Sequence, residues 1–387
     1  MTAEERRTLN LKITKRYKKF IVFMVVILLS WTALLLYHNR ENIIDNIANL
    51  QNQYQNTAET SFTEFPISIS SYQIKKLSDS TAIFSNGHFY SYDEKGKNIL
   101  SRQLTYESPV LKTYENRALV YESGGNRLSV FSKSKLMYSE TTDDIITYAC
   151  IGKSGMTAVL TESTNKMLKI TVFDAQGNDI YIIESRPKTW SMAISPNGKG
   201  LITVETGTEN GSFYSKANYY DLTSEKSSPV YSTDSIEGLC LEVYGTDEGG
   251  VFMVCDREAS FFDKKGKMLK NIKYTSQPKS FTYEKGKAVF LIYNDSTHQA
   301  QLAIINGYDN NPIYIEANND MNYLASGVAH FSVLTNDSVM VYNYSGKVKD
   351  TVKLKKIYTK VIPSGNAFYL AGEDIIERKE YRDLNID

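Results

Sequence analysis

The chain has 387 residues, enough for one large domain with accessory segments or for two ordinary domains. Its 44 basic residues balance 44 acidic residues, so the net charge gives no indication of a nucleic-acid partner. Four histidines and three cysteines provide little material for zinc sites or for histidine-based acid–base chemistry.

A basic segment precedes an uncharged apolar run at the N-terminus. Residues 1–19 contain seven lysines and arginines, and the eighteen residues Phe20 to Tyr37 carry no charge. As a helix this run extends about 27 Å, close to the roughly 30 Å hydrocarbon core of a bilayer. A cleavable signal peptide has the same order of segments, but this run is longer than a signal core and no small-residue cleavage site follows. The sequence predicts an uncleaved single-pass anchor in the cell membrane, with the 1–19 tail cytoplasmic and the remainder of the chain outside the cytoplasm.

An apolar stripe of helical spacing follows the anchor. Its members Ile43, Ile47, Leu50 and Tyr54 lie 4, 3 and 4 residues apart. The stripe covers under two heptads, whereas a coiled coil is indicated by three or more. Residues 38–62 are therefore expected to form a helical stalk or linker, with a weak dimer through the stalk as the alternative.

From about Thr63 the pattern changes to two-residue alternation, and one motif recurs. Four copies are SYDEKGKNIL from Ser91, VFDAQGNDIY from Val172, FFDKKGKMLK from Phe261 and VYNYSGKVKD from Val341. The aligned anchor positions, spaced 37 to 47 residues apart, are Tyr92, Phe131, Phe173, Tyr220, Phe262, Ile305 and Tyr342. This period is typical of the four-stranded blade of a β-propeller.

The motif itself has the chemistry of a hairpin turn between the third and fourth strands of a blade. Its Asp can accept a hydrogen bond from the backbone two residues on, at Asp93, Asp174 and Asp263. Its Gly closes the turn, at Gly96, Gly177 and Gly266. A second turn, SPNG at Ser195–Gly198, is expected between first and second strands.

The first strands of eight units are expected near Tyr72, Pro109, Ile145, Thr189, Gly238, Ser280, Asn322 and Tyr358. The fourth unit divides into strands over 189–195, 201–207, 215–222 and 227–234. The last unit lacks an outer strand, and Thr63–Ser70 is predicted to supply it and close the ring, with Pro66 tolerated at a sheet edge. The fold predicted for 63–387 is an all-β, eight-bladed β-propeller, with seven blades as the alternative.

The recurring turns resemble the Asp-x-x-Gly-Lys turns of quinoprotein-type (PQQ-like) propeller repeats, and SPNGKG resembles the first hairpin of WD40-like and TolB-like propellers. Two features depart from these families. Leu100, Tyr181 and Leu269 occupy the region of the quinoprotein tryptophan, and the Gly-His and Trp-Asp signatures of WD40 units are missing. An anchor followed by a divergent propeller is similar to an uncharacterised family of bacterial single-pass membrane proteins with a domain of unknown function. That resemblance implies fold and topology, and no activity.

Known catalytic motifs are absent from the sequence. It contains no G-x-S-x-G, H-E-x-x-H, Walker loop or G-x-G-x-x-G, and no two of His38, His88, His298 and His330 stand at ligand spacing. We expect no catalytic residue, no cofactor and no metal site, although carboxylates from distant blades could converge without leaving a sequence pattern.

Two cysteines flank one predicted hairpin. With the turn centred between Asp247 and Glu248, Cys240 and Cys255 oppose each other, close enough for a disulfide. Such a bond would persist outside the cytoplasm. The alternative is two buried thiols on neighbouring strands, and Cys150 has no evident partner.

The sequence predicts a membrane-anchored, extracytoplasmic propeller that serves as a protein-interaction scaffold in the cell envelope and is not an enzyme. Radial blades form a rigid body with faces built from loops, which suits this role. The alternatives are a small-ligand or glycan-binding sensor and a divergent hydrolase. A polar centre with converging carboxylates would favour these alternatives, whereas a filled centre with an aromatic face would favour the scaffold.

Overall fold

The computed structural model describes residues 64–66, 72–185, 189–209, 211–274, 276–294, 298–364, 367–373 and 375–380, together with Met24 and Ser30. The chain separates into two compact units, Met1–Ala58 and Glu59–Asp387, and every described strand belongs to the second unit. Within the described ranges, no helix is long and apolar enough to cross a membrane. Apart from Met24 and Ser30, the predicted anchor Phe20–Tyr37 and stalk 38–62 lie outside the described residues.

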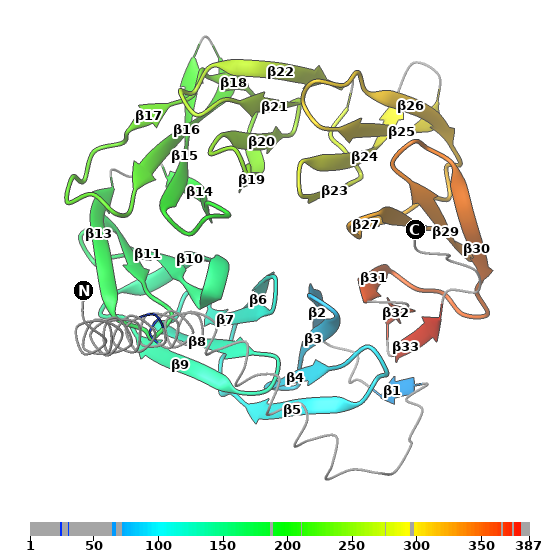
Figure 1. Ribbon diagram of the computed structural model, residues 1–387, viewed down its shortest axis with the longest axis horizontal. Helices are drawn as coiled ribbons and strands as arrows, with labels where there is room; N and C mark the ends of the chain where they lie inside the picture. The colour runs from blue at the N-terminus through cyan, green and yellow to red at the C-terminus, as the bar shows by residue number, and fades with distance from the viewer. Residues whose placement is uncertain are drawn as a thin grey trace, which may run out of the picture. The chain divides into compact units, whose positions relative to one another are not determined.

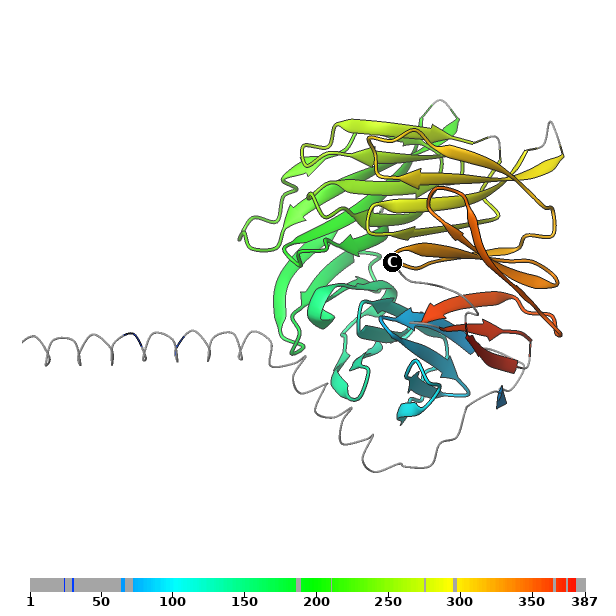
Figure 2. The same ribbon diagram turned by 45° about the vertical axis from the view of Figure 1, so that its right-hand side comes forward.

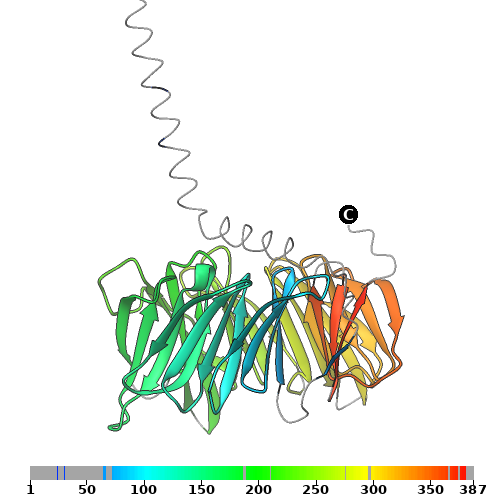
Figure 3. The same cartoon turned by 90° about the horizontal axis from the view of Figure 1, so that it is seen from below.

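The strands of the second unit form eight antiparallel sheets around a common centre, with the first strand of each sheet innermost (Figure 1). Each sheet is a blade, and the blades are numbered 1 to 8 in chain order. Turned views show the blades following one another round the ring (Figure 2) and standing side by side (Figure 3). The prediction of eight blades rather than seven is confirmed.

The strands of the first four blades have the following bounds. Blade 1 contains β2 (Tyr72–Leu77), β3 (Ser80–Ser85), β4 (His88–Tyr92) and β5 (Asn98–Gln103). Blade 2 contains β6 (Pro109–Tyr114), β7 (Arg117–Glu122), β8 (Arg127–Ser132) and β9 (Leu136–Thr141). Blade 3 contains β10 (Ile145–Ile151), the 3₁₀ turn η1 (Lys153–Gly155), β11 (Thr157–Glu162), β12 (Leu168–Phe173) and β13 (Asp179–Ser185). Blade 4 contains β14 (Thr189–Ile194), β15 (Gly200–Glu209), β16 (Ser212–Asp221), β17 (Tyr231–Ser232) and β18 (Ile236–Glu237).

The remaining blades continue the same order. Blade 5 contains β19 (Cys240–Gly245), β20 (Val251–Cys255), β21 (Glu258–Phe262) and β22 (Met268–Lys273). Blade 6 contains β23 (Ser280–Glu284), β24 (Lys287–Asn294), β25 (Gln299–Asn306) and β26 (Ile313–Ala317). Blade 7 contains β27 (Tyr323–Ser326), β28 (His330–Leu334), β29 (Ser338–Asn343) and β30 (Val348–Lys353). Blade 8 contains β31 (Lys360–Ser364), β32 (Ala367–Ala371) and β33 (Ile375–Glu380), with β1 (Glu64–Pro66) as its outer strand.

Strand β1 closes the ring as predicted. It pairs antiparallel with β33, and Phe65 is the Cα partner of Ile376. The described strand covers three residues of the predicted Thr63–Ser70, and Pro66 lies in this edge strand, a position where proline is tolerated. The Tyr369 hydroxyl of blade 8 donates a 2.7 Å hydrogen bond to the Asp93 carbonyl of blade 1. A side-chain contact therefore also joins the first and last blades.

The apolar core lies between blades rather than in one central mass. Each of the eight clusters of buried side chains combines residues of two neighbouring blades. One example is the stacked ring pair of Phe89 from blade 1 and Phe131 from blade 2, with centroids 4.2 Å apart. The cluster that contains Ile74 and Ile376 joins blade 1 to blade 8, which completes the circle of contacts. Blades therefore stabilise one another in sequence around the ring.

The recurring motif forms the predicted turn. Asp93 Oδ1 accepts hydrogen bonds from the backbone N–H groups of Lys95 at 2.9 Å and Lys97 at 2.8 Å. Asp174 and Asp263 accept the equivalent pairs in blades 3 and 5. The glycines of the motif have positive φ angles: Gly96, Gly177, Gly266 and Gly346. The motif is thus explained by backbone geometry, because its Asp and Gly meet the needs of the turn.

Blade 4 differs from its prediction. The expected strands ended at residue 207 and resumed at 215, but β15 and β16 continue to the pairs Thr208↔Phe213 and Glu209↔Ser212. Gly211, which precedes β16, has a φ of 83°, a conformation that glycine adopts without strain. The outer strand is correspondingly reduced to β17, with β18 pairing separately to β16. The result is the longest central hairpin among the described blades, with strands of ten residues against eight in blade 6.

Candidate functional site

Three consecutive innermost strands contain a β-bulge near their first residues. The pairing register passes over Thr147 in β10, Trp190 in β14 and Leu241 in β19. A bulge adds one unpaired residue to a strand and changes the direction of its side chain. The same device therefore occurs at the same end of blades 3, 4 and 5, which are neighbours in the ring (Figure 1).

Large apolar side chains are exposed at this end of the three blades. Trp190 is 61 % exposed and Leu241 is 36 % exposed. Because the strands of a blade are antiparallel, the starts of its first and third strands lie on one face of the propeller. The exposed residues at such starts, which we call the apolar surface, are Ile145, Met167, Trp190, Phe213 and Leu241. Exposed apolar groups gathered on one face are a feature of interaction sites.

Hydrogen bonds hold the backbone of the apolar surface. The Phe213 carbonyl accepts a 2.8 Å hydrogen bond from the Gly238 N–H, and Ser215 Oγ accepts one of 3.0 Å from the Cys240 N–H. Buried Glu258 accepts the Glu237 N–H at 2.8 Å. The segment that leads into Leu241 is therefore fixed before any partner arrives, which reduces the entropy lost on binding.

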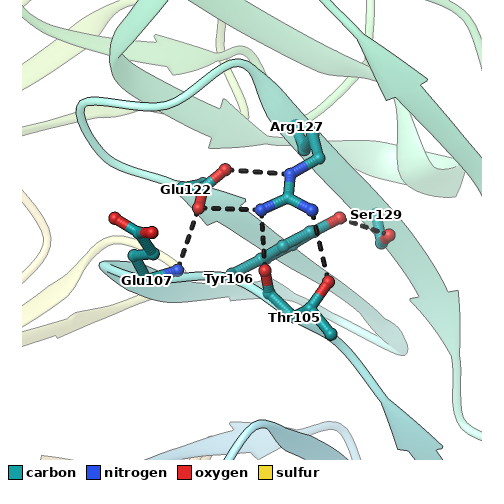
Figure 4. A network of polar contacts seen from close by, with 6 residues as sticks. All are labelled: Thr105, Tyr106, Glu107, Glu122, Arg127 and Ser129. Atoms are coloured by element: carbon teal, nitrogen blue, oxygen red, sulfur yellow. Dashed lines mark hydrogen bonds and ion pairs between the residues drawn. The ribbon is translucent and has the colours of Figure 1, made fainter.

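A related network fixes the connection between blades 1 and 2 on the same face (Figure 4). Glu122, whose side chain is 9 % exposed, accepts hydrogen bonds from the Glu107 N–H at 2.9 Å and from Arg127 Nη2 at 3.0 Å. These bonds, that of Arg127 first, lower the pKa of the Glu122 carboxyl. Arg127 Nη1 donates to Thr105 Oγ1 at 3.2 Å, and the guanidinium lies 5.1 Å from the Tyr106 ring centre. In blades 2 and 5 alike, a buried carboxylate binds the backbone of the preceding interblade connection.

Charge does not distinguish the apolar surface from its surroundings. Two acidic residues, Asp143 and Glu237, and two basic residues, Lys166 and Arg257, border it. All four are exposed to solvent. Exposed aromatic and aliphatic side chains are the property that the five residues of the apolar surface share. No sequence motif marks these residues, although Trp190 is the only tryptophan outside the predicted anchor.

The structure places the two predicted disulfide cysteines opposite each other. Cys240 is the Cα partner of Cys255, and both are buried free thiols. The bulge at Leu241 makes this pairing possible, because the register nearer the turn, Val243↔Met253, would offset the cysteines by one residue. The neighbouring Cys255 thiol and burial together raise the pKa of Cys240. The disulfide itself stays a prediction.

The remaining candidate chemistry lies apart from the apolar surface. His88 and His330 begin strands β4 and β28, and burial lowers the pKa of His330. Cys150 is buried in blade 3. In the part of the chain that the structure describes, no group of three or more His, Cys, Asp and Glu side chains could hold a metal ion.

The fold is shared with several solved structures. BamB from Moraxella catarrhalis is 12 % identical, with a TM-score of 0.52 over 83 % of this chain and 99 % of that chain. Sqt1 from Chaetomium thermophilum is 13 % identical, with a TM-score of 0.57 over 83 % of this chain and 98 % of that one. Sqt1 from Saccharomyces cerevisiae is 10 % identical, with a TM-score of 0.57 over 84 % of this chain and 100 % of that one. At these identities the likeness concerns the propeller fold alone.

Sequence comparison gives a more specific result. Among curated proteins, none has a sequence that matches this chain. A family model matches residues 50–379, which is most of the chain and includes the whole described propeller from β1 almost to the end of β33. The chain belongs to the family of unknown function DUF5711.

Proposed function

We propose that this chain is a non-catalytic β-propeller that binds a partner protein of the cell envelope through its apolar surface. The observation that carries the proposal is the pair Trp190 and Leu241, which occupy the same bulged position on neighbouring inner strands and expose their side chains. Leaving a tryptophan in water forgoes the stabilisation of burying it, roughly 25 cal/mol for each Å² of apolar surface. Tryptophan is also enriched among the residues that dominate binding energy.

The partner is expected to supply an apolar or aromatic segment. The surface offers side chains from three blades on a backbone that is already fixed, and its border carries charges of both signs. A partner recognised mainly by charge would require one sign to prevail. Binding should therefore depend on Trp190, Leu241 and Phe213 and respond weakly to salt.

A hydrolase is the less favoured alternative. Glu242 of β19 and Glu284 of β23 both extend from innermost strands, and each faces a lysine, Lys112 at 3.9 Å and Lys76 at 3.4 Å. A pair of carboxylates for acid–base catalysis would instead face one reacting bond. These two carboxylates are neutralised by lysines and do not form such a pair.

The membrane part of the proposal is supported by the sequence of the N-terminal region. Eighteen uncharged residues, Phe20 to Tyr37, follow a basic tail, so we propose that they anchor the chain with its propeller outside the cytoplasm. Protease added to intact cells after removal of any outer barrier should then degrade the propeller. Protection of the propeller until the inner membrane is permeabilised would contradict this orientation.

The partner surface is tested by site-specific crosslinking. A photoreactive residue is placed at Phe213 of the full-length protein in the cells that produce it, and the crosslinked protein is identified by mass spectrometry. Detergent-solubilised full-length protein and the fragment 60–387 are used for parallel pull-downs. The double variant Trp190→Asp/Leu241→Asp should lose the crosslinked partner.

The matched control is Val328→Asp. Val328 is 56 % exposed and lies in the turn between β27 and β28, on the opposite face of the propeller. This variant should retain the partner at the wild-type level. Equal recovery by the double variant and the wild type, or the recovery of no partner by either form, would remove the support for a partner surface on blades 3 to 5.

A further inference from the structure

Three lysines of neighbouring blades extend from innermost strands at the centre of the ring. They are Lys360 of β31, Lys75 of β2 and Lys112 of β6, from blades 8, 1 and 2. Glu242 of β19, in blade 5, lies across the ring, and its Oε1 atom is 3.9 Å from Lys112 Nζ. This lysine layer therefore contains three positive charges and one negative charge.

The backbone places two of these lysines at the same height. Gln73 of β2 accepts a 2.8 Å hydrogen bond from the Leu111 N–H of β6 and donates one to the Pro109 carbonyl. The side-chain amide of Gln73 thus fixes β2 relative to β6. Lys75 and Lys112 come after these contacts on their own strands and are therefore placed side by side. Burial lowers the pKa of Lys75, and the positive charges of Lys112 and Lys360 lower it further.

Two of the lysines lack an anionic partner. Lys75 and Lys360 form no ion pair or side-chain hydrogen bond among the described residues. Burial is the largest cause that lowers the pKa of each, and for Lys75 it outweighs the opposing effect of Glu242. Lys75 is exposed and Lys360 is half-buried, so an anion that enters the centre of the ring can reach both ammonium groups. Like charges that lie together without a counter-ion favour the binding of such an anion.

The next layer of the ring shows the contrast. Lys76 Nζ, one residue further along β2, lies 3.4 Å from Glu284 Oε2 of blade 6. In that layer the lysine has its own carboxylate, as expected where charges serve only to fill the centre. The lysine layer contains one carboxylate, that of Glu242, for three lysines.

Tyrosines supply further hydrogen-bond donors. Tyr148 of β10 lies beneath Lys112, with Nζ 5.3 Å from the ring centre. Burial raises the pKa of Tyr148 and of Tyr323 on β27, and Glu242 raises both further, so both hydroxyls stay protonated at neutral pH. Neutral hydroxyls beside ammonium groups are suited to oxygen acceptors.

We infer that the lysine layer binds a small multivalent anion that carries phosphate or carboxylate groups. Such a ligand bridges Lys75, Lys112 and Lys360 and neutralises the layer. This inference is independent of the partner surface, because it depends on different residues.

The test is isothermal titration calorimetry on the full-length protein in detergent. The probes are inorganic phosphate, pyrophosphate and citrate, with ionic strength held constant by chloride. At least one probe should bind saturably at one site per chain. Phosphate and pyrophosphate without citrate would identify a phosphate ligand, and citrate alone would identify a carboxylate ligand.

Variants decide whether the lysine layer is the site. Lys75→Met and Lys360→Met should each weaken binding by roughly tenfold or more, whereas Glu242→Gln should strengthen it. The control Lys95→Met removes the same charge from an exposed turn of blade 1 and should leave affinity unchanged. Because they relieve like-charge repulsion, the two layer variants should fold and should raise the melting temperature without anion. They should also lose the further rise that the anion gives the wild type.

Two results would overturn the inference. One is the absence of saturable heat with all three probes. The other is equal affinity in the double variant Lys75→Met/Lys360→Met and in Lys95→Met.

Discussion

Cys240 and Cys255 lie directly opposite each other in blade 5, and both are buried. Opposed residues of an antiparallel pair are close enough for a disulfide. If the propeller lies outside the cytoplasm, protein isolated without reductant should contain a peptide crosslinked at these two positions. Mass spectrometry of the unreduced protein, with Cys255→Ser as the control, measures this directly.

If Cys240 and Cys255 are reduced, their rate of alkylation should show it. The neighbouring Cys255 thiol and burial raise the pKa of Cys240, so this thiol is protonated and unreactive in the folded state. Alkylation should then be slow in native protein and fast after unfolding. Rapid alkylation of the native protein at Cys240 would contradict the buried pairing.

Removal of β1 should weaken the ring. A chain that starts at residue 72 lacks the strand that pairs with β33, and it leaves the backbone edge of blade 8 exposed. Compared with the fragment 60–387, it should lose roughly 1–3 kcal/mol of unfolding free energy and aggregate more readily. Denaturant titration and light scattering of the two fragments test this, and identical stability would mean that closure depends on the blade contacts alone.

The Glu122 network should be necessary for the stability of blades 1 and 2. Glu122→Ala leaves the Glu107 N–H and the Arg127 guanidinium without their acceptor, and it should cost about 2 kcal/mol. Because the folded-state pKa is below the ordinary value of 4.5, the contribution is present above that pH and is lost as pH falls further. Acid titration of stability should therefore be flatter in the variant than in the wild type.

Two glycines with the same backbone conformation should respond differently to alanine. Gly266 has a φ of 82°, and a Cβ there would lie 2.1 Å from the Ser232 carbonyl oxygen of blade 4. Gly286 has a φ of 79° but no atom within 4 Å of the added Cβ. Gly286→Ala should cost about 1–2 kcal/mol from backbone conformation alone, and Gly266→Ala clearly more. Equal losses of thermal stability in the two variants would indicate that Ser232 moves away from the added Cβ at no cost in free energy.

Alkaline pH should destabilise the propeller through its half-buried tyrosines Tyr114 and Tyr283. Burial, followed by nearby carboxylates, raises the pKa of Tyr114 to about 12, and burial likewise raises that of Tyr283 to about 12. The folded state holds these protons more tightly than the unfolded state does. Their contribution is complete below the ordinary value of 10.0 and declines as pH rises from there to about 12. Denaturant titrations across this range measure the slope, which Tyr283→Phe should reduce.

The fold could be predicted from the sequence because its signals are local and repeated. Asp93 and Gly96 specify a hairpin through their own backbone chemistry, and the same pattern recurs in blades 3, 5 and 7. Closure could be predicted because the last unit lacked a strand and alternating residues near Phe65 were unassigned. The extension of the β15–β16 hairpin was not predicted, because residues 208–214 show no apolar alternation that would indicate a strand.

The candidate sites could not be predicted in the same way. Trp190 and Leu241 become exposed through bulges, which change the register by one residue and leave no fixed motif in the sequence. Lys75, Lys112 and Glu242 come together only when blades 1, 2 and 5 surround one centre. Such groupings depend on the closed ring, and no segment contains them all.

The pairing of β1 with β33 also has a mechanical consequence. The strand closest to the N-terminal region is held in the sheet that the C-terminal strand completes. Tension applied to the N-terminus is therefore borne first by a three-residue ladder at the rim of blade 8, before any other strand is loaded. Under force the propeller should open at this seam, and the rupture force of the short ladder sets how much pull it can transmit.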